Sequence, residues 1–501
     1  MPIRPHQVQA VPKPLVEGLE KLRQDLDIPE DFSPEVHDAA LHAARHPRLP
    51  RLDRTDLDFV TVDPEGSRDL DQAVFIEATE PGFTVWYAIA DVAAFVSPGD
   101  PIDLEAHARG QTLYGPHQRT PLHPPELSED AASLLENETR PAVLWRLTLD
   151  ATGHQTARTV QRALIRSRAQ LTYREVQDAL DHGTASESLQ LLKTVGQLRE
   201  HIEHERGGVS LQIPEQEVET SNGEWHIVHR SALPVEGWNA QISLLTGMAA
   251  AEIMLEAAVG LLRTLPPADA ASLRKLRETA KALRIEWPPE MDYPEFVRTL
   301  DPERPDHAAM LYSCTLLFRG AGYLAFNGQT PENSQHAALA THYAHVTAPL
   351  RRLVDRYASE VCLALCAGEL VPEWVTDALP QLPKEMESSN RKASAYERGI
   401  VNMVETLMLS PHVGQEFTGT VVEVDETGEK GRFIIRNPAV EASIKGTDLP
   451  LGQEIRVRLV EADTANAQSR FELVEAIDGA ASYSAASSAA ASVGSTSTTE
   501  R

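Results

Sequence analysis

The stretch Thr61-Val-Asp63-Pro-Glu-Gly-Ser-Arg-Asp69-Leu-Asp71-Gln-Ala-Val74 carries the strongest structural signal in the chain. An apolar run ends at Asp63, a Pro/Gly/Ser turn follows, and a second apolar run starts just after Asp71. Side chains two residues apart in an extended segment point the same way, so Asp69 and Asp71 share a side. The turn allows Asp63 to fold over them. The stretch therefore predicts a strand–turn–strand unit that gathers three carboxylates.

Three carboxylates with no lysine nearby form an oxygen-only site. Such a site suits Mg²⁺, which takes carboxylates, water and substrate phosphate as ligands. The alternative interpretation is structural, because Asp in a Pro-Gly turn commonly caps backbone groups. The spacing alone leaves both interpretations open.

Outward from this stretch, strand patterns come first and helical patterns later. Short apolar runs predict strands at 59–62, 73–76, 84–90, 142–149 and 156–171. Helical periodicity predicts long helices at 237–265, 269–283, 305–324, 349–366 and 383–409. Strands followed by helices indicate an α+β fold rather than alternating α/β. We therefore assign 51–410 to one domain, β-rich in its first part and helical in its second.

Both ends of the chain differ from this central domain. Residues 1–50 carry helical patterns at 16–27 and 34–46, which predict a helical module. The module is either of helix-turn-helix size or a strap on the next domain, and we favour the strap. Short strands separated by turn residues at 412–475 predict an OB-type barrel. The Ala/Ser-rich segment 476–501 buries too little apolar surface to fold, which predicts a disordered tail.

The overall composition is that of a folded globular chain. Of its 501 residues 42% are hydrophobic and 24% charged, which excludes global disorder. Lys and Arg number 46 against 74 Asp and Glu, a net charge of −28. This charge argues against passive coating of nucleic acid or anionic membrane, because the summed field repels phosphate. It leaves room for an enzyme that holds nucleic acid in a local basic channel.

Cysteines and apolar runs bear on the compartment. Cys314, Cys362 and Cys366 lack the spacing of a disulfide framework or a zinc site, which fits a reducing compartment. No apolar run reaches the roughly 18 residues of a membrane span, and the N-terminus lacks the apolar stretch of a secretory signal. We expect a cytoplasmic protein without membrane association.

A second motif, Thr347-Ala-Pro349-Leu-Arg351-Arg352, combines a helix start with two arginines. Pro in a first turn predicts that a helix begins here. Free backbone amides and two guanidinium groups at one point form an anion site suited to phosphate. The alternative is a solvated ion pair between Arg351 and Asp355. We favour the anion site, because cations at a helix N-terminus oppose the helix dipole.

A third motif, Gln111-Thr-Leu-Tyr114-Gly-Pro-His117, places an aromatic residue in a Gly-Pro loop. A loop tyrosine is able to stack on a nucleobase. More often such a residue only covers an edge of the core, so on this motif alone both roles stay open.

Taken in order, these motifs resemble those of the RNase II/RNB family of exoribonucleases. TVDPEGSRDLDQAV resembles the family's acidic motif, and YAIADVAAFVSPGDPIDLEAHARGQTLYGP resembles the stretch that follows it. YAHVTAPLRRLVDR is similar to the arginine segment, and SNRKASAYER is similar to a late helical element. The resemblance covers about 58–409. The barrel after it resembles the S1-type RNA-binding domain of these enzymes.

The resemblance implies a Mg²⁺-dependent 3′-to-5′ exoribonuclease that hydrolyses single-stranded RNA to nucleoside 5′-monophosphates. We expect Mn²⁺ to substitute for Mg²⁺, because it accepts mixed ligands more readily. The resemblance also implies that Asp63, Asp69 and Asp71 hold the metal. Asp71 would also be catalytic, together with Arg351, which would stabilise the charge on the phosphorane. The residues implied to contact RNA are Tyr114, Arg352 and Glu397.

The sequence departs from the family pattern in three places. Gln72 stands where the family has a fourth acid, and we expect its amide to leave one carbonyl oxygen for a more weakly bound metal. On this basis Gln72→Asp is expected to lower the Mg²⁺ requirement. Leu265 stands where the family often has a stacking aromatic. The 50 residues before the central domain have no room for the family's paired N-terminal cold-shock domains.

Two functions from different classes follow. The first is the exoribonuclease, acting on single-stranded RNA as a monomer, with no DNA or membrane partner. The alternative is a catalytically weak RNA-binding relative that has lost turnover through Gln72. Intact Asp71, Arg351, Tyr114 and Glu397 favour the enzyme, because a decayed site loses several such groups together.

Overall fold

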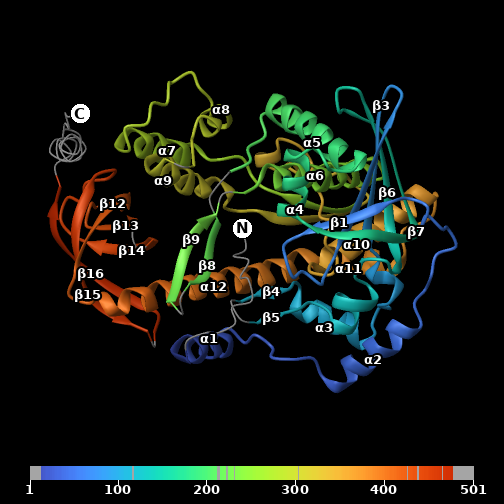
Figure 1. The fold of residues 1–501 in the computed structure, drawn as a ribbon, viewed down its shortest axis with the longest axis horizontal. Coiled ribbons are helices and arrows are strands. Elements are labelled where there is room, and N and C mark those ends of the chain that lie inside the picture. The colour runs from blue at the N-terminus through green and yellow to red at the C-terminus, as the bar shows by residue number, and fades with distance from the viewer. Residues whose placement is uncertain are drawn as a thin grey trace, which may run out of the picture.

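The computed structural model of the 501-residue chain describes residues 13–477, except for 116–117, 212–214, 222–223, 231, 303, 426, 437–438 and 465. Two β-rich bodies lie at opposite ends of the molecule (Figure 1). A long helix, α12 (Leu382–Leu409), runs from the C-terminal body into the centre.

A closed five-stranded barrel forms the first half of the central domain. Its strands are β1 (Phe59–Asp63), β2 (Gln72–Thr79), β3 (Gly82–Ala90), β6 (Thr139–Asp150) and β7 (Gln155–Thr172). Neighbouring strands are antiparallel, except that β1 runs parallel to β7 and so closes the barrel. Because β1 and β2 are neighbours, the acidic stretch between them lies at one end of the barrel.

Helices form the second half of the domain and pack on the barrel. In chain order they are α4 (Tyr173–Asp181), α5 (Glu187–Arg206), α6 (Pro234–Glu256), α7 (Ala270–Ala282), α8 (Tyr293–Arg298), α9 (Pro305–Cys314), α10 (Leu353–Ala367) and α11 (Glu373–Ala378), followed by α12. The largest hydrophobic core joins barrel residues such as Trp145 to Ile242 of α6 and Tyr357 of α10. The strand β6 is buried on both faces from Pro141 to Trp145. The α+β prediction is confirmed.

Two expected helices, at 237–265 and 305–324, are too long because each runs into a strand. The strands are β10 (Val259–Thr264) and β11 (Gly322–Asn327), which pair antiparallel. Ala258 has a φ of 54° and Gly260 a φ of 156°, values that an α-helix does not contain. A short apolar run does not distinguish helix from strand, so the distant pairing partner decides.

The helix α10 begins later than expected, because residues 349–351 form a turn and Arg352 is extended. The carboxylate of Asp355 accepts the Ala348 amide at 2.7 Å, so the helix itself caps this turn. Arg351 and Arg352 therefore lie just before the helix rather than inside its first turn.

Two N-terminal helices, α1 (Lys13–Asp25) and α2 (Pro34–Arg45), lie against the central domain. The helix α1 packs on α12, where Leu15 and Leu19 are buried with residues of that helix. The helix α2 packs on α3 (Pro101–Arg109). Both N-terminal helices thus bury apolar side chains against helices of the central domain.

A five-stranded sheet curls into a small barrel after α12. Its strands are β12 (Glu416–Val424), β13 (Lys430–Arg436), β14 (Ala439–Lys445), β15 (Glu454–Asp463) and β16 (Gln468–Ala476). They follow the order β14-β13-β12-β15-β16, with Phe433 and Phe471 in edge-to-face contact inside. The predicted OB-type barrel is confirmed. The predicted tail lies, apart from its first two residues, outside the part of the chain that the structure describes.

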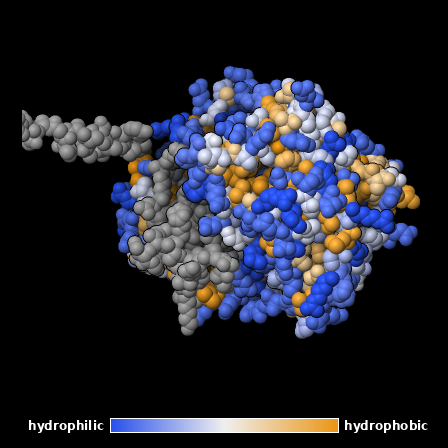
Figure 2. All heavy atoms as spheres, turned by 45° about the vertical axis from the view of Figure 1, so that its right-hand side comes forward, coloured by the Kyte–Doolittle hydropathy of each residue, from blue (hydrophilic) through white to orange (hydrophobic). Residues whose placement is uncertain are grey.

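Two short hairpins complete the central domain. One joins β4 (Leu113–Tyr114) to β5 (Arg119–Thr120), and the other joins β8 (Glu215–Ser221) to β9 (Glu224–Arg230). One face of the molecule is mainly hydrophilic with small apolar patches (Figure 2). Among the described helices, none combines the length and hydrophobicity of a membrane span.

Candidate active site

The acid loop, residues 63–72, is anchored through its central Leu70. This side chain is completely buried, and its amide donates to Ser133 Oγ at 2.9 Å. Ser133 Oγ in turn donates to the Arg68 carbonyl at 2.6 Å. These contacts hold the backbone between Asp69 and Asp71, so both carboxylates project from a well-fixed segment.

Asp71 is buried and makes two contacts with the turn before α10. The Leu350 amide donates to Asp71 Oδ1 at 2.8 Å, and Arg351 Nε lies 3.3 Å from Oδ2. Burial raises the pKa of Asp71 well above its usual value; Arg351 and the Leu350 amide oppose this shift, and nearby Asp69 adds to it. The structure thus brings together the two residues that separate motifs identified as catalytic candidates.

Asp69 is paired with a cation that the sequence patterns did not reveal. Arg119 Nη1 donates to Asp69 Oδ1 at 2.7 Å, and Nη2 forms an ion pair with Glu129. Burial lowers the pKa of Arg119, but Asp69 and Glu129 outweigh it, so the pKa is raised and the guanidinium stays charged. The sequence showed only that no lysine lies near the three carboxylates, and the structure adds an arginine beside Asp69. Arg119 escaped notice because it lies in a separate hairpin with no motif of its own.

Asp63 is the last residue of β1 and is partly buried beside Thr172 of β7. In the part of the chain that the structure describes, no three Asp, Glu, His or Cys side chains lie close enough to hold a metal. The donor chemistry of Asp63, Asp69 and Asp71 fits a hard divalent cation. In the structure, guanidinium groups contact two of the three carboxylates, Asp69 and Asp71.

Gln72, the first residue of β2, has both ends of its amide hydrogen-bonded inside the protein. Its Nε2 donates to the Thr347 carbonyl at 2.7 Å. Its Oε1 accepts from the Tyr87 hydroxyl and, at 3.3 Å, from Ser243 Oγ. The expectation that Gln72 leaves a carbonyl oxygen for a metal is wrong, because two hydroxyl donors already occupy that oxygen. Gln72 instead ties β2 to the segment before α10.

Arg352 is held by another carboxylate. Its Nε and Nη2 donate to the two oxygens of Asp355, each at 2.9 Å, and Asp355 is completely buried. Burial lowers the pKa of Arg352, but Asp355 more than compensates and the pKa is raised. The alternative pairing of Arg351 with Asp355 is therefore wrong. Arg351 remains available to the acid loop because its neighbour takes Asp355.

Tyr114 lies in the β4–β5 hairpin, directly opposite Arg119. The hairpin is tied to the turn before α10, where the Thr112 amide donates to the Arg351 carbonyl at 3.0 Å. Burial lowers the pKa of Arg351, and Tyr114 and Asp71 are the neighbours that most strongly raise it. Tyr114 is therefore an electrostatic neighbour of Arg351.

Glu397 lies on α12, the helix that supports this hairpin. Its neighbour Tyr396 packs so closely on Gly115 that a Cβ there would lie 2.5 Å from the tyrosine hydroxyl oxygen. Burial raises the pKa of Glu397. Within the described ranges, Glu397 forms no hydrogen bond or ion pair with the acid loop, so it is near the hairpin but not joined to the carboxylates.

Comparison with known protein families shows which family contains these residues. The RNB domain profile matches residues 51–365, which is more than half of the chain. The chain belongs to the RNB family. Residues 415–474 of this RNB protein match the RNase II-type exonuclease C-terminal S1 domain. Both matches confirm the resemblance seen in the motifs.

Curated relatives of the RNB protein carry the name Ribonuclease R. The protein of Aquifex aeolicus (strain VF5) is 26% identical over 458 residues, covering 83% of this chain and 64% of the relative. That of Escherichia coli (strain K12) is 29% identical over 407 residues, covering 75% of this chain and 49% of the relative. The chain thus spans between about half and two thirds of the length of these relatives.

Solved structures share the fold. Mycoplasma genitalium RNase R in complex with ribose methylated single-stranded RNA matches with a TM-score of 0.80 at 20% identity, covering 94% of this chain and 79% of that one. Yeast Ssd1, described as a pseudonuclease, matches with a TM-score of 0.67 at 15% identity, covering 89% and 58%. The RNB fold therefore occurs both in a nuclease-named relative and in a pseudonuclease.

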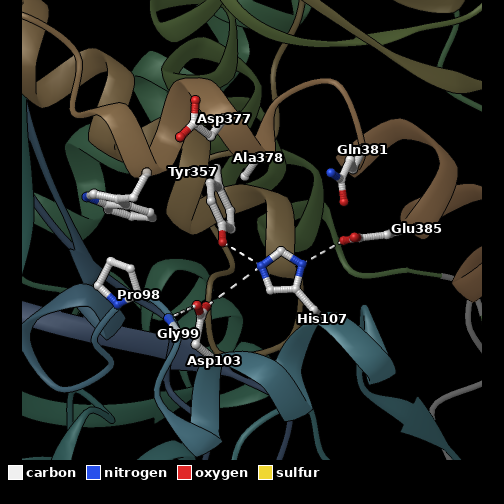
Figure 3. A pocket seen from close by; sticks show the side chains of 10 residues that line it. Pro98, Gly99, Asp103, His107, Tyr357, Asp377, Ala378, Gln381 and Glu385 are labelled. Atoms are coloured by element: carbon white, nitrogen blue, oxygen red, sulfur yellow. Dashed lines mark hydrogen bonds and ion pairs between the residues drawn. The ribbon is translucent and has the colours of Figure 1, made fainter.

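A pocket of about 380 Å³ lies among α3, α10, α11 and α12 of the RNB protein (Figure 3). Within it, His107 Nδ1 lies 2.7 Å from Glu385 and Nε2 lies 2.6 Å from the Tyr357 hydroxyl. Arg356 donates to Asp103 at 2.6 Å. These contacts cross-link the helices α3, α10 and α12 to one another. The helix α10 follows the arginine turn, residues 349–352, and α12 carries Glu397. The sequence patterns had not identified this cluster.

Proposed function

We propose that the chain is a divalent-metal-dependent 3′-to-5′ exoribonuclease that hydrolyses single-stranded RNA to nucleoside 5′-monophosphates. The contact between Asp71 and Arg351 carries the proposal, because it joins the acid loop to the arginine turn within the RNB domain. The similarity to proteins named Ribonuclease R supports it.

Arg351 would stabilise the negative charge that grows on the phosphate during attack. Its side chain is 30% exposed, so a phosphate is able to reach it. The backbone link through Thr112 and the contact with Asp71 hold it in place. A fixed guanidinium aimed at developing charge lowers the barrier without reorganising during the reaction.

Asp63, Asp69 and Asp71 would hold Mg²⁺, or Mn²⁺ in its place. When bound, such an ion activates water as a nucleophile and neutralises charge on the phosphate. The ion would meet Arg119 at Asp69, where the guanidinium donates to Oδ1 at 2.7 Å.

The hairpin and α12 would hold the end of the RNA. Tyr114 would stack on the terminal base beside Arg351, and Glu397 would contact the 3′-terminal sugar, where the 2′-hydroxyl distinguishes RNA from DNA. The fork of Arg352 is occupied by Asp355, so we assign it the task of holding the turn rather than binding RNA. The C-terminal barrel would bind the strand upstream.

A gel assay tests the proposal. End-labelled oligoadenylate is incubated with the full chain in Mg²⁺ or in EDTA, beside the DNA oligonucleotide of the same length. We expect stepwise shortening of the RNA and release of 5′-AMP in Mg²⁺ only, and no shortening of the DNA. Binding of RNA without shortened product at any Mg²⁺ or Mn²⁺ concentration would refute the enzyme.

A second candidate is an RNA-binding relative with weak turnover. Two observations favour it: the amide of Gln72 is occupied on both sides, and Arg119 holds Asp69. The same gel distinguishes the two candidates when it is combined with filter binding. The weak relative binds oligoadenylate with normal affinity and leaves its length unchanged.

A further inference from the structure

Arg119 has no role in the function proposed above, although it contacts Asp69 directly. It lies in β5, and its guanidinium bridges Asp69 at 2.7 Å and Glu129. The side chain is 28% exposed, and those of Asp69 and Glu129 are 15% and 23% exposed. The bridge therefore lies at the solvent edge of the acid loop, where a small ion has access.

The backbone next to Arg119 is held by two buried arginines. Arg23 Nη1 donates to Thr120 Oγ1 at 2.8 Å, and Arg109 Nη1 donates to the Pro121 carbonyl at 3.1 Å. Because these contacts fix the hairpin base, a change at Arg119 is confined to its own flexible side chain. That side chain also has a second carboxylate, Glu129, within reach.

Asp69 Oδ1 already has one close cation. The guanidinium now lies 2.7 Å from it, which is the distance of a charge-assisted hydrogen bond. A divalent ion bound to the same oxygen would lie within a few ångströms of the guanidinium, and like charges at that separation repel strongly. Arg119 and a metal ion on Asp69 would therefore each weaken the binding of the other.

We propose that Arg119 is a positioning residue that competes with the divalent cation for Asp69. Without metal it neutralises the carboxylate and keeps the acid loop from repelling itself. When the ion binds, Arg119 leaves Asp69 and keeps Glu129. This rests on the proposed function, because it takes the acid loop as the metal site.

Mn²⁺ binding to the full chain without RNA, measured by calorimetry, tests the competition. Arg119→Met removes the charge and keeps the length of the side chain, so its dissociation constant for Mn²⁺ is expected to fall on the order of tenfold. Arg119→Lys retains the charge and is expected to stay near the wild-type value. Arg168→Met is the matched control, because Arg168 pairs with Asp58 at 3.1 Å outside the acid loop.

Thermal unfolding supplies a second readout that needs no RNA and no activity. In EDTA, Arg119→Met should melt below the wild type, because Asp69 loses its cation. Saturating Mn²⁺ should then raise its melting temperature more than it raises that of the wild type. A residue with a purely structural role would lower stability without strengthening metal binding.

An unchanged or higher dissociation constant in Arg119→Met would overturn the proposal, and Arg119→Gln serves as the neutral variant if the methionine does not fold. If the wild type binds Mn²⁺ but releases no nucleotide, the exoribonuclease fails and the competition stands. If neither wild type nor neutral variant binds Mn²⁺, the acid loop is not a metal site and both proposals fail.

Discussion

Charged side chains are paired both in the C-terminal barrel and around the acid loop, but the pairs are formed differently. In the barrel three pairs join residues directly opposite on adjacent strands: Arg456 with Glu475, Arg458 with Glu416, and Arg470 with Glu461. About half of each side chain is exposed, so water screens these pairs. Register alone brings their partners together.

Around the acid loop, the partners come from distant parts of the chain. Asp69 meets Arg119 and Asp71 meets Arg351, and the side chain of Asp71 is only 6% exposed. Removing a carboxylate from water costs free energy that an ion pair only partly returns. Such groups are therefore a stronger indication of a reaction than of stability. The contrast predicts that substitutions of charged residues have large effects on activity at the acid loop and small effects on stability in the barrel.

The largest effect is expected for Asp71→Asn. The Leu350 amide still has an oxygen to bind, so the fold and RNA affinity should stay nearly intact. Loss of the negative charge should lower the single-turnover hydrolysis rate on the order of 10³-fold. Filter binding and single-turnover assays measure the two quantities separately. Asp58→Asn, outside the loop, is the control, and equal loss of binding and hydrolysis would mean that Asp71 is structural.

Gln72→Asp sharpens the comparison. The family pattern predicts that this substitution lowers the Mg²⁺ requirement, whereas the hydrogen bonds of Gln72 predict that it does not. A shorter carboxylate cannot donate to the Thr347 carbonyl, which now receives Nε2 at 2.7 Å. We expect a loss of about 2 kcal/mol in unfolding free energy and no decrease in the Mg²⁺ needed for half-maximal rate. Urea unfolding in EDTA and a Mg²⁺ titration measure these effects. Gln72→Met controls for lost hydrogen bonds, and a lowered Mg²⁺ requirement in Gln72→Asp would restore the idea of a missing fourth acid.

Glu405 lies where α12 meets the C-terminal barrel, buried on α12, and it accepts the Glu441 amide of β14 at 3.1 Å. Burial raises its pKa to about 8, with Arg432 opposing. A pKa raised on folding contributes stability below the unfolded value of 4.5, and this contribution is lost as the pH rises through about 8. Glu405→Gln should therefore gain melting temperature over the wild type by about 2 °C or more from pH 6 to pH 9. A difference that does not change with pH would contradict this.

The smallest effect is expected for Arg458→Met in the barrel. Its partner Glu416 lies 2.6 Å away, but the side chains are 51% and 37% exposed. The unfolding free energy should change by less than about 0.5 kcal/mol, and less still in high salt. Urea unfolding at two salt concentrations measures this. A loss of unfolding free energy as large as that of Gln72→Asp would show that the energetic difference between the two regions does not come from solvent exposure.

Local sequence patterns predicted much of this fold. The strands that begin near Phe59 and Ala73, the long helix before residue 409 and the small C-terminal barrel all follow from periodicity and turn residues. The errors fall where a local pattern fits two structures. Residues 259–264 look helical but pair with 322–327. The turn before α10 depends on the capping carboxylate of Asp355, which lies inside the helix it delays.

The acidic residues, the two arginines and the tyrosine could be named from motifs of ten or so residues, because strand period and turn chemistry act over that range. The contacts that each of these residues makes could not be predicted from the motifs. Arg351 faces Asp71 because Asp355 takes Arg352, Gln72 is enclosed by Tyr87 and Ser243, and Arg119 reaches Asp69 from another hairpin. These partners are set by how the barrel, hairpin and helices pack, since electrostatic contacts depend on distance in space and not on separation along the chain.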